Sequence, residues 1–390
     1  MDISVLLNPV KKEVIERCSL SHPKQIGNTI CVYADEAFFP RLEDFSLAII
    51  GVEDDRGSAD NEGCKDAPDA IRHSLYPLFN HWPDLKIVDL GNVKSGFQVE
   101  DTYYALNQVF LTLLKYRIVP IVIGGSQDLT YPIYQVYENT GKLVNITAID
   151  SRFDIGQDNE RLNSHSYLSY IIMHQPNYLF NFTNLGFQTY YIDNESVSLM
   201  KQLLFDTYRL GVIKTDIELS EPLLRNADII TIDASAFKSS EMPGLKNSSP
   251  NGFTGEEGCR MARYAGLNSK LTSIGFFEYN PGYDVNRQGA NNIAEMIWYF
   301  VEGFANRVND FPTNENKDDF VKYIVQMEGQ REDMVFLCHK ITKRWWIDLS
   351  LIADEKRERH HYIPCSHEDY ELSMENEIPD KWWQFYQKLM

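Results

Sequence analysis

Short apolar runs alternate with amphipathic stretches between about residues 45 and 308. The runs are rich in Ile, Val and aromatic residues, and in chain order they read FSLAIIGV, LKIVDLG, RIVPIVIGG, VNITAID, FQTYYI, DIITIDAS and LTSIGFFE. Such runs are typical of strands that are buried on both faces of a sheet. Helical spacing is clearest in TYYALNQVFLTLLKY, VSLMKQLLFDTYRL and IAEMIWYFVEGFANR. The alternation predicts an α/β fold with a largely parallel sheet.

The two ends of the chain do not follow this alternation. Residues 1–44 have weak periodicity, which predicts a helical or irregular N-terminal segment. The polar stretch FPTNENKDD indicates a boundary between a main domain at 45–308 and an extension at 309–390. In the extension, MVFLCHKITKRWWIDL predicts a pair of strands, and PDKWWQFYQKL predicts a short terminal helix. Four of the six tryptophans lie there, and we expect them to pack the extension onto the main domain, with a partner or subunit interface as the alternative.

Polar side chains follow four of the apolar runs. In chain order they are Gln127, Asp150, Arg152, Asp154, Asp233, Ser235 and Glu278. Ligands of an open parallel sheet bind outside the carboxyl ends of its strands. If these strands are neighbours, Gln127 and the four carboxylates converge on one crevice. Four carboxylates in one crevice need cations, protons or a metal to compensate their charge.

Composition narrows the possible partners. The formal net charge of −19 repels phosphate backbones, so we expect no nucleic-acid partner. The sequence has no run of 18 apolar residues, so we expect no transmembrane helix and no membrane partner. The six cysteines are scattered without a CxxC motif, which favours free thiols in a reducing cytoplasm.

Four ordered blocks resemble the manganese ureohydrolases, the family of arginase, agmatinase and formimidoylglutamase. That family carries GGDH, DAHxD, SxDxDxxDPxxxPG and ExNP, and here the matching text is GGSQ at 124–127, DSRFD at 150–154, TIDASAFKSSEMPG at 231–244 and EYNP at 278–281. The loop GVEDDRGSADNEGCKDAPDAIR at 51–72 is similar to the family's first loop. The resemblance covers about residues 45–308 and is nearest to the formimidoylglutamase branch. It implies a three-layer α/β/α sandwich around an eight-stranded mostly parallel sheet, and a homo-oligomer.

The resemblance also implies a binuclear manganese site, but this chain departs from the family at several ligand positions. The positions of one metal are Gln127, Asp150, Asp154 and Asp233. The positions of the other are Arg152, Asp150, Asp233 and Ser235, so two of its four ligands are lost. Carboxylate oxygens suit Mn²⁺. We therefore expect either no metal or a single divalent ion, with Mn²⁺ the first choice.

Arg152 is a permanent cation, which a metal would repel and the remaining aspartates would attract. We predict that it replaces the second metal electrostatically, and that Lys238 adds another fixed charge. The resemblance assigns Glu278 to a substrate amidinium and places Glu278 and Asp154 at catalytic positions. It also places Asn280 and His165 near the substrate, although the spacing of His165 alone favours an ordinary surface or core histidine.

Four other polar residues are expected to lie away from this chemistry. The sequence context favours a helix cap for Asp128, a loop position for Asp158, and a solvated pair for His360 and His361.

Two functions follow from these patterns. The first is a ureohydrolase-fold protein that has lost the parent hydrolysis and acts by binding or assembly, because a bridging hydroxide needs both ions. The second is a hydrolase of C–N bonds in linear amidines, of the formimidoylglutamate or guanidino type, that uses one metal. A small amidine or guanidine is the candidate ligand. A different enzymatic use of the same crevice is a third possibility.

Overall fold

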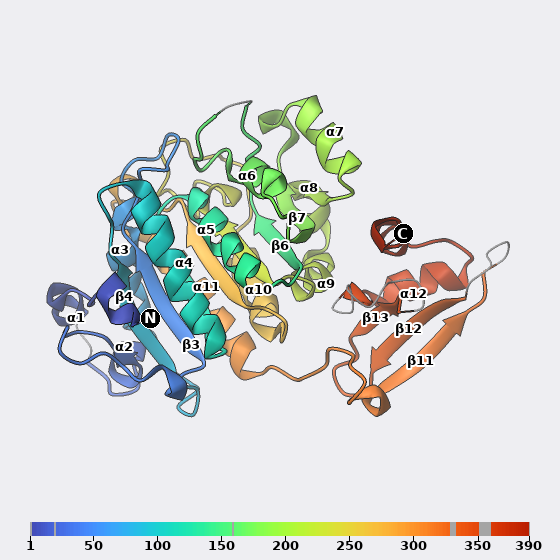
Figure 1. Ribbon diagram of the computed structural model, residues 1–390, viewed down its shortest axis with the longest axis horizontal. Coiled ribbons are helices and arrows are strands. Elements are labelled where there is room, and N and C mark those ends of the chain that lie inside the picture. The colour runs from blue at the N-terminus through green and yellow to red at the C-terminus, as the bar shows by residue number, and fades with distance from the viewer. Residues whose placement is uncertain (1, 19–20, 158–159, 328–332, 351–359, 390) are drawn as a thin grey trace.

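A ten-stranded sheet forms the centre of the main domain in the computed structural model, which describes residues 2–18, 21–157, 160–327, 333–350 and 360–389 (Figure 1). Its order is β1-β4-β3-β5-β10-β9-β6-β7-β8, with β2 beside β4. Eight strands are parallel to one another: β3 (Leu47–Val52), β4 (Ile87–Val93), β5 (Val119–Ile123), β6 (Val144–Ile149), β7 (Leu179–Phe187), β8 (Asp206–Arg209), β9 (Ile229–Asp233) and β10 (Ser273–Phe277). The predicted mostly parallel sheet is confirmed, and it has ten strands instead of the expected eight. Two short N-terminal strands, β1 (Leu7–Asn8) and β2 (Cys31–Val32), extend it at β4.

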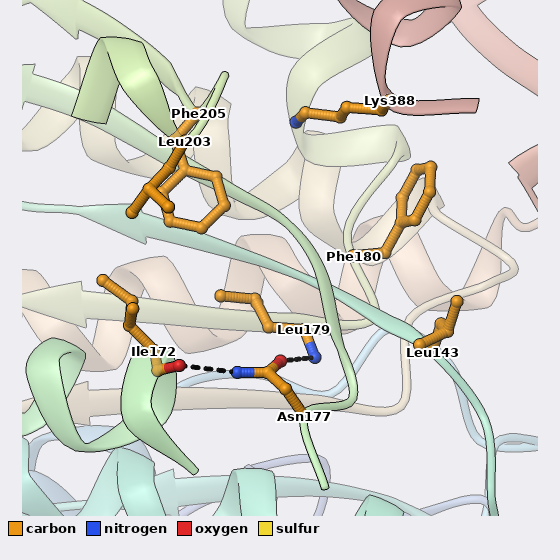
Figure 2. A pocket seen from close by; sticks show the side chains of 8 residues that line it. All are labelled: Leu143, Ile172, Asn177, Leu179, Phe180, Leu203, Phe205 and Lys388. Carbon is orange, nitrogen blue, oxygen red and sulfur yellow. Dashed lines mark hydrogen bonds between the residues drawn. The ribbon is translucent and has the colours of Figure 1, made fainter. Parts of the chain in front are cut away.

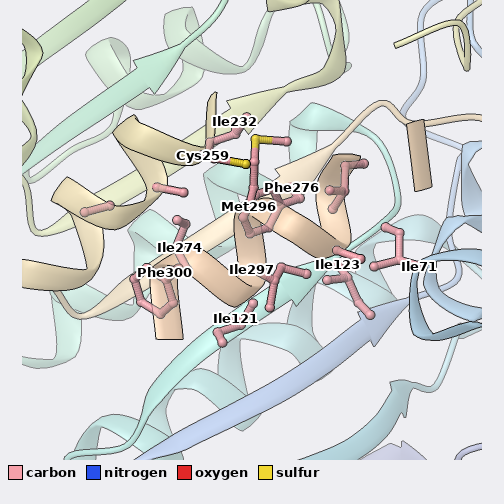
Figure 3. Close-up of a cluster of buried hydrophobic side chains, with 14 of the residues drawn as sticks. Ile71, Ile121, Ile123, Ile232, Cys259, Ile274, Phe276, Met296, Ile297 and Phe300 are labelled. Atoms are coloured by element: carbon pink, nitrogen blue, oxygen red, sulfur yellow. The ribbon is translucent and has the colours of Figure 1, made fainter. Parts of the chain in front are cut away.

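Helices cover both faces of this sheet, because successive residues of each strand point to opposite sides. Ile121 and Ile123 of β5 face one hydrophobic cluster, and Val122 between them faces the other. The first cluster includes residues of α3 (Ala67–Leu75), α10 (Gly255–Leu267) and α11 (Gln288–Ala305); Figure 3 shows Met296, Ile297 and Phe300 of α11 packed over the strands. The second includes residues of α4 (Val99–Lys115), α5 (Thr130–Gln135), α6 (Tyr167–Met173) and α7 (Asn194–Gln202). The result is the predicted α/β/α sandwich.

Short helices complete the main domain. Near the N-terminus these are α1 (Lys12–Arg17) and α2 (Ile26–Thr29), and between β8 and β9 they are α8 (Leu210–Thr215) and α9 (Ser220–Arg225).

Two of the predicted elements are wrong. The run FQTYYI does not form a strand, because β7 ends at Phe187 and a 3₁₀ turn follows at Thr189–Tyr191. The stretch VSLMKQLLFDTYRL is not one helix, since α7 ends at Gln202 and β8 begins at Asp206. The break between them contains Leu204 with φ of 57°, a backbone conformation that ends a helix and is rare for leucine.

The C-terminal extension has its own antiparallel sheet. Its strands are β11 (Phe320–Val325), β12 (Met334–His339), β13 (Trp345–Asp348) and β14 (Tyr362–Cys365), and each pairs with the next along the chain. The predicted pair of strands corresponds to β12 and β13. Two helices follow, α12 (His367–Met374) and α13 (Asp380–Leu389), and the second confirms the predicted terminal helix.

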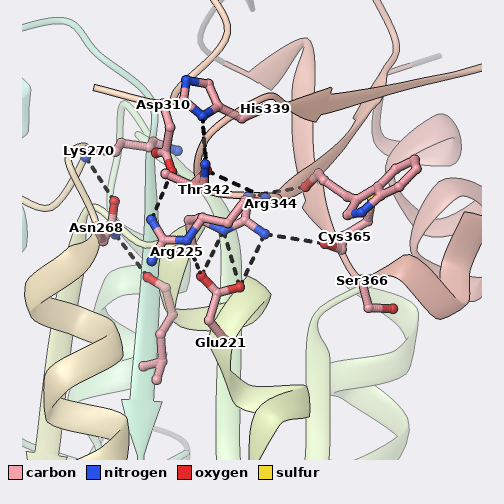
Figure 4. Close-up of polar contacts among 12 residues, drawn as sticks. Glu221, Arg225, Asn268, Lys270, Asp310, His339, Thr342, Arg344, Cys365 and Ser366 are labelled. Carbon is pink, nitrogen blue, oxygen red and sulfur yellow. Dashed lines mark hydrogen bonds and ion pairs between the residues drawn. The ribbon is translucent and has the colours of Figure 1, made fainter. Parts of the chain in front are cut away.

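Helix α9 joins the main domain to the extension through a charged network (Figure 4). The Arg225 guanidinium donates to the backbone carbonyls of Trp345 and Cys365, at 3.1 and 3.3 Å, and lies 4.3 Å from the ring centroid of the buried Trp346. Glu221, one turn earlier, forms ion pairs with Arg225 at 3.0 Å and with Arg344 at 3.1 Å. Trp346 therefore contacts Arg225 of the main domain.

The remaining sequence expectations concern thiols and membrane spans. All six cysteines are free thiols, and all except Cys31 are buried. Within the ranges that the structure describes, no helix is both long enough and apolar enough to cross a membrane.

Candidate metal centre

Three aspartates meet at the carboxyl ends of two neighbouring strands. Asp150 follows β6 directly, Asp154 lies in the same loop, and Asp233 ends β9. Because β6 and β9 pair in parallel, their carboxyl ends are adjacent. One carboxylate oxygen of each residue lies within 4.8 Å of the others, and all three side chains are buried. The predicted convergence is confirmed for these residues, called here the aspartate triad.

Glu278 faces the same cavity from the end of β10, the strand beside β9. Its Oε1 accepts a hydrogen bond from the Gln127 backbone N–H at 2.9 Å, which brings the two predicted residues together. Its Oε2 accepts from the Asn61 side-chain amide at 3.0 Å. Asn61 was not predicted as a site residue. The available signal was its place in the first loop, two positions before Gly63 in SADNEG.

Two of these acidic residues have an unusual backbone. Asp154 has φ of 52° and Glu278 has φ of 62°, both in the left-handed region that residues with a side chain seldom adopt. Each such position costs on the order of 1–3 kcal/mol, and these conformations concentrate at functional sites. Their occurrence together at one cavity supports the assignment of a site here.

Burial and mutual repulsion make the charged forms of these carboxyl groups unfavourable. Burial raises the pKa of Asp150 well above its ordinary value, and the neighbouring Asp154 and Asp233 raise it further. Burial likewise raises the pKa of Asp154 and of Glu278, with the charge of Asp233 adding to both. The pKa of Asp233 is raised by burial and lowered in part by hydrogen bonds from Ser235. Without a cation the cluster therefore favours protons, and a bound cation would favour the carboxylates.

Two of the predicted ligand residues, Asp150 of the triad and Gln127, each carry a buried oxygen that lacks a partner within the described ranges. Among the described residues, Asp150 Oδ2 and Gln127 Oε1 have no hydrogen-bond partner. A buried polar atom without a partner is costly, and native structures contain few of them. Carboxylate and amide oxygens are suitable donors for a hard divalent cation. The donor set therefore fits one such ion at the aspartate triad.

Arg152 lies at the rim of the cavity and does not pair with the triad. Its guanidinium stands over the ring of Tyr191, 4.7 Å from the centroid, while its backbone N–H donates to Asp150 Oδ1 at 2.8 Å. Over the part of the chain that the structure covers, no ion pair within 4.0 Å joins it to a carboxylate. The attraction expected from the aspartates therefore does not produce an ion pair with Arg152. Its charge still lowers the pKa of Asp154 and Asp233 in part.

Ser235 faces the triad as predicted. Its Oγ donates to Asp150 Oδ1 at 3.4 Å and shares a hydrogen bond of 2.9 Å with Ser151 Oγ. Lys238 is not among the residues that line the cavity, whereas Lys246, which the sequence did not single out, is. Of the two lysines, the exposed Lys246 is therefore the one at the cavity.

The two predicted substrate contacts differ in position. His165 lines the cavity, and its Nε2 lies 3.7 Å from Asp60 Oδ1 at the entrance. Asn280 is buried behind the wall, where its Nδ2 donates to the Glu62 carbonyl at 2.8 Å and its Oδ1 accepts from the Gly282 N–H at 2.9 Å. Asn280 thus holds the first loop, and its predicted contact with substrate is not supported by its position.

The polar residues that were expected to lie away from this chemistry have different outcomes. Asp128 is buried and accepts hydrogen bonds from Tyr103 and Ser126, so it does not belong to the triad. His360 was expected in solvent but is 2% exposed and stacks on Phe180, with ring centroids 3.8 Å apart. Asp158 lies outside the described residues.

Comparisons with known proteins agree with this geometry. The model of the arginase family matches residues 45–302. Formimidoylglutamases from Photorhabdus laumondii and Staphylococcus haemolyticus are 23% and 25% identical over 276 and 278 residues, covering 66% and 65% of this chain and 86% and 85% of theirs. Trypanosoma cruzi formiminoglutamase with Mn²⁺ is similar in structure, with a TM-score of 0.65 and 21% identity over 73% of this chain and 99% of that one.

Formimidoylglutamase from Bacillus subtilis is similar as well, with a TM-score of 0.61 and 16% identity over 69% of this chain and 92% of that one. The structural matches have the same fold, and the family match spans strands β3 to β10 together with Asp150, Asp154, Asp233 and Glu278. The chain belongs to the arginase family of ureohydrolases, near the formimidoylglutamases.

Proposed function

We propose that this protein binds one divalent cation, Mn²⁺ by preference, at Asp150, Asp154 and Asp233, next to a cavity for a small amidine or guanidine ligand. The observation that carries the proposal is the buried Asp150 Oδ2, which has no hydrogen-bond partner among the described residues and belongs to three clustered carboxylates. The Gln127 amide oxygen is also buried without a hydrogen-bond partner among the described residues and would be the fourth ligand. The related structure from T. cruzi contains Mn²⁺.

The cationic ligand follows from the charges around the cavity. Five acidic residues line it, namely Asp60, Asp150, Asp154, Asp233 and Glu278. The positive side chains are Arg152, whose guanidinium rests on Tyr191, and the exposed Lys246. One divalent ion leaves this wall negative, so an amidinium beside Glu278 is favoured.

The parent hydrolysis is expected to be lost. A hydroxide that bridges two ions needs ligands for both, and position 235 offers only a hydroxyl toward Asp150. Arg152 cannot serve as a ligand, because arginine stays protonated. We therefore infer binding of the amidine rather than its two-metal hydrolysis, and keep for Arg152 the untested role of a fixed cation at the rim.

One-metal hydrolysis of a linear amidine is the second candidate. It is favoured by Glu278, which faces the cavity from the strand next to Asp233, and by the similarity to formimidoylglutamases. A bound cation would supply Lewis acidity and a water of lowered pKa. This chain would orient the ligand through Glu278, itself held by Asn61 and the Gln127 N–H.

Metal counting combined with turnover separates the candidates. We expect elemental analysis of protein saturated with Mn²⁺ and desalted to give one ion per chain. Calorimetry should then detect binding of agmatine or formimidoylglutamate, without release of urea or formamide. Turnover with one ion would favour the second candidate. Two ions per chain, or none, would overturn the one-metal site.

Restoring the three altered ligands tests whether the strand-end geometry still fits two ions. The triple variant Gln127→His, Arg152→His and Ser235→Asp is expected to bind two Mn²⁺ per chain, because Ser235 Oγ already lies 3.4 Å from Asp150 Oδ1. The double variant that keeps Ser235 lacks the last carboxylate and is the matched control, with one ion expected. A triple variant that still binds one ion contradicts the expectation that the ancestral spacing is retained.

A further inference from the structure

Two cavities of the molecule differ in what their polar side chains can still bind. A cavity of about 370 Å³ at the amino ends of β6, β7 and β8, opposite the aspartate triad, is mainly apolar (Figure 2). Its Asn177 amide donates to the Ile172 carbonyl and accepts from the Leu179 N–H. Its one cation, Lys388, reaches in from α13 and donates to Asn181 Oδ1. The polar side chains of this cavity are therefore already engaged within the protein.

Glu278, in the cavity at the aspartate triad, keeps binding capacity on both carboxylate oxygens. Its Oε1 accepts from the Gln127 backbone N–H at 2.9 Å, and its Oε2 accepts from Asn61 Nδ2 at 3.0 Å. Over the described part of the chain, these are the hydrogen bonds that the carboxylate receives. A carboxylate has about four acceptor sites, two on each oxygen. One site therefore remains on each oxygen for a ligand.

The Asn61 amide is held so that its nitrogen meets Glu278. Its Nδ2 also donates to the Glu278 backbone carbonyl at 2.6 Å, and its Oδ1 accepts from Asn280 Nδ2 at 3.3 Å. Asn280 is itself oriented, because its Nδ2 donates to the Glu62 carbonyl at 2.8 Å and its Oδ1 accepts from the Gly282 N–H at 2.9 Å. Both asparagines are buried. They form a relay, Asn280 to Asn61 to Glu278, that fixes the plane of the carboxylate.

Gly63 of the first loop makes room for this relay. Its φ is 109°, and a Cβ at this position would lie 2.8 Å from Asn280 Nδ2 and 2.9 Å from Asn280 Oδ1. Glycine adopts such a backbone conformation without steric cost. The loop can therefore bring Asn61 to Glu278 while Asn280 packs directly against its backbone.

We propose that Asn61, oriented by Asn280, positions the Glu278 carboxylate as a two-point acceptor that selects planar amidinium ligands over ammonium ligands. An amidinium or guanidinium presents two N–H groups in one plane, which match the two remaining acceptor sites of a carboxylate that cannot rotate. An ammonium is a compact charge with three rotatable donors, so a fixed carboxylate plane favours it less. This inference rests on the proposed function, because it places the cationic end of the ligand at Glu278.

Calorimetry on the Mn²⁺-saturated full chain with butylguanidine and pentylamine tests the inference, since these cations have similar length and equal charge at pH 7. We expect the wild type to bind butylguanidine about tenfold or more tightly than pentylamine. Asn61→Leu removes the donor at similar size and should bring the two affinities within about threefold, with Mn²⁺ affinity within about twofold of the wild type. Asn247→Leu is the matched control, because Asn247 lines the same cavity but donates to Asp60 Oδ2 at 2.8 Å. It should keep the wild-type preference.

Equal affinity of the wild type for the two cations would overturn this inference alone, and so would an unchanged preference in Asn61→Leu. If Asn61→Leu binds neither cation, Asn280→Ala decides, since it keeps the Asn61 donor and removes only the group that orients it. Asn280→Ala should weaken butylguanidine binding more than pentylamine binding, and equal or absent losses count against the relay. Wild-type protein that holds Mn²⁺ but binds neither cation would instead contradict the ligand of the proposed function, and this inference with it.

Discussion

Asp233→Asn is expected to weaken Mn²⁺ binding by about 100-fold or more, because loss of a charged ligand exceeds the 10–100-fold cost of losing a partner outside the coordination shell. The substitution preserves shape, and its side-chain oxygen can still accept the 2.6 Å hydrogen bond from the Ser235 N–H. It also removes one of three charges that repel one another in the buried triad. The metal-free variant should therefore be at least as stable as the wild type, while calorimetry shows the loss of Mn²⁺ affinity.

Asp228 provides the matched control at the other end of the same strand. It is also buried, precedes β9, accepts the Asn145 N–H at 2.8 Å and lies 3.4 Å from Lys270 Nζ. Asp228→Asn should leave Mn²⁺ affinity within about twofold and lower stability, since it breaks a buried ion pair. Equal losses of Mn²⁺ affinity in both variants would mean that the effect is general to β9 and not a property of the triad.

Arg72→Met is expected to lower the free energy of unfolding by about 3–5 kcal/mol, the usual cost of removing one partner of a buried ion pair. Arg72 is 0% exposed and pairs with Asp89 through Nε at 2.8 Å and Nη2 at 2.9 Å. Its Nη1 donates to Asn92 Oδ1 at 2.6 Å. The variant leaves the Asp89 charge buried without its main partner. Denaturant unfolding in the absence of metal measures the loss.

An exposed pair on the same face of the sheet gives the comparison. Arg263 of α10 lies 3.0 Å from Glu302 of α11, and the two side chains are 41% and 28% exposed. Exposed pairs contribute little, so Arg263→Met should cost no more than about 1 kcal/mol. A similar loss in both variants would show that burial does not determine the effect. The buried pair also explains the arginine at the end of APDAIR, which holds α3 to β4.

The parallel strands could be predicted because their runs are largely apolar on both faces, as in β5, where every residue is apolar and buried. Strand β7 was placed too late in the sequence, because its buried residues include Asn181, Thr183 and Asn184, and polar residues conceal a buried strand. Strand β8 was hidden in an apparently continuous helical pattern. The left-handed backbone at Leu204 that separates it from α7 has no signal in the side chain of a leucine.

The aspartate triad could be predicted because strand order alone brings its members together. The direction of Arg152 could not be predicted, because its partner Tyr191 lies 39 positions later in the stretch that was read as a strand. The sequence showed only one influence on the direction of the Arg152 side chain, its electrostatic attraction to the aspartates. In the folded chain, a ring from a neighbouring turn offers the guanidinium a contact without the full desolvation that an ion pair inside the cavity would require.

The C-terminal extension and the triad lie at opposite ends of the same strands. From Val144 to Asp150, β6 and its following residue span roughly 20 Å at about 3.3 Å per residue. The residues from Ile146 to Ile149 pair with β7 on one side and β9 on the other, so a local displacement at one end is resisted by both neighbouring strands. The sheet thus separates the triad from the surface that contacts the extension. We expect substitutions in either region to leave the geometry of the other unchanged.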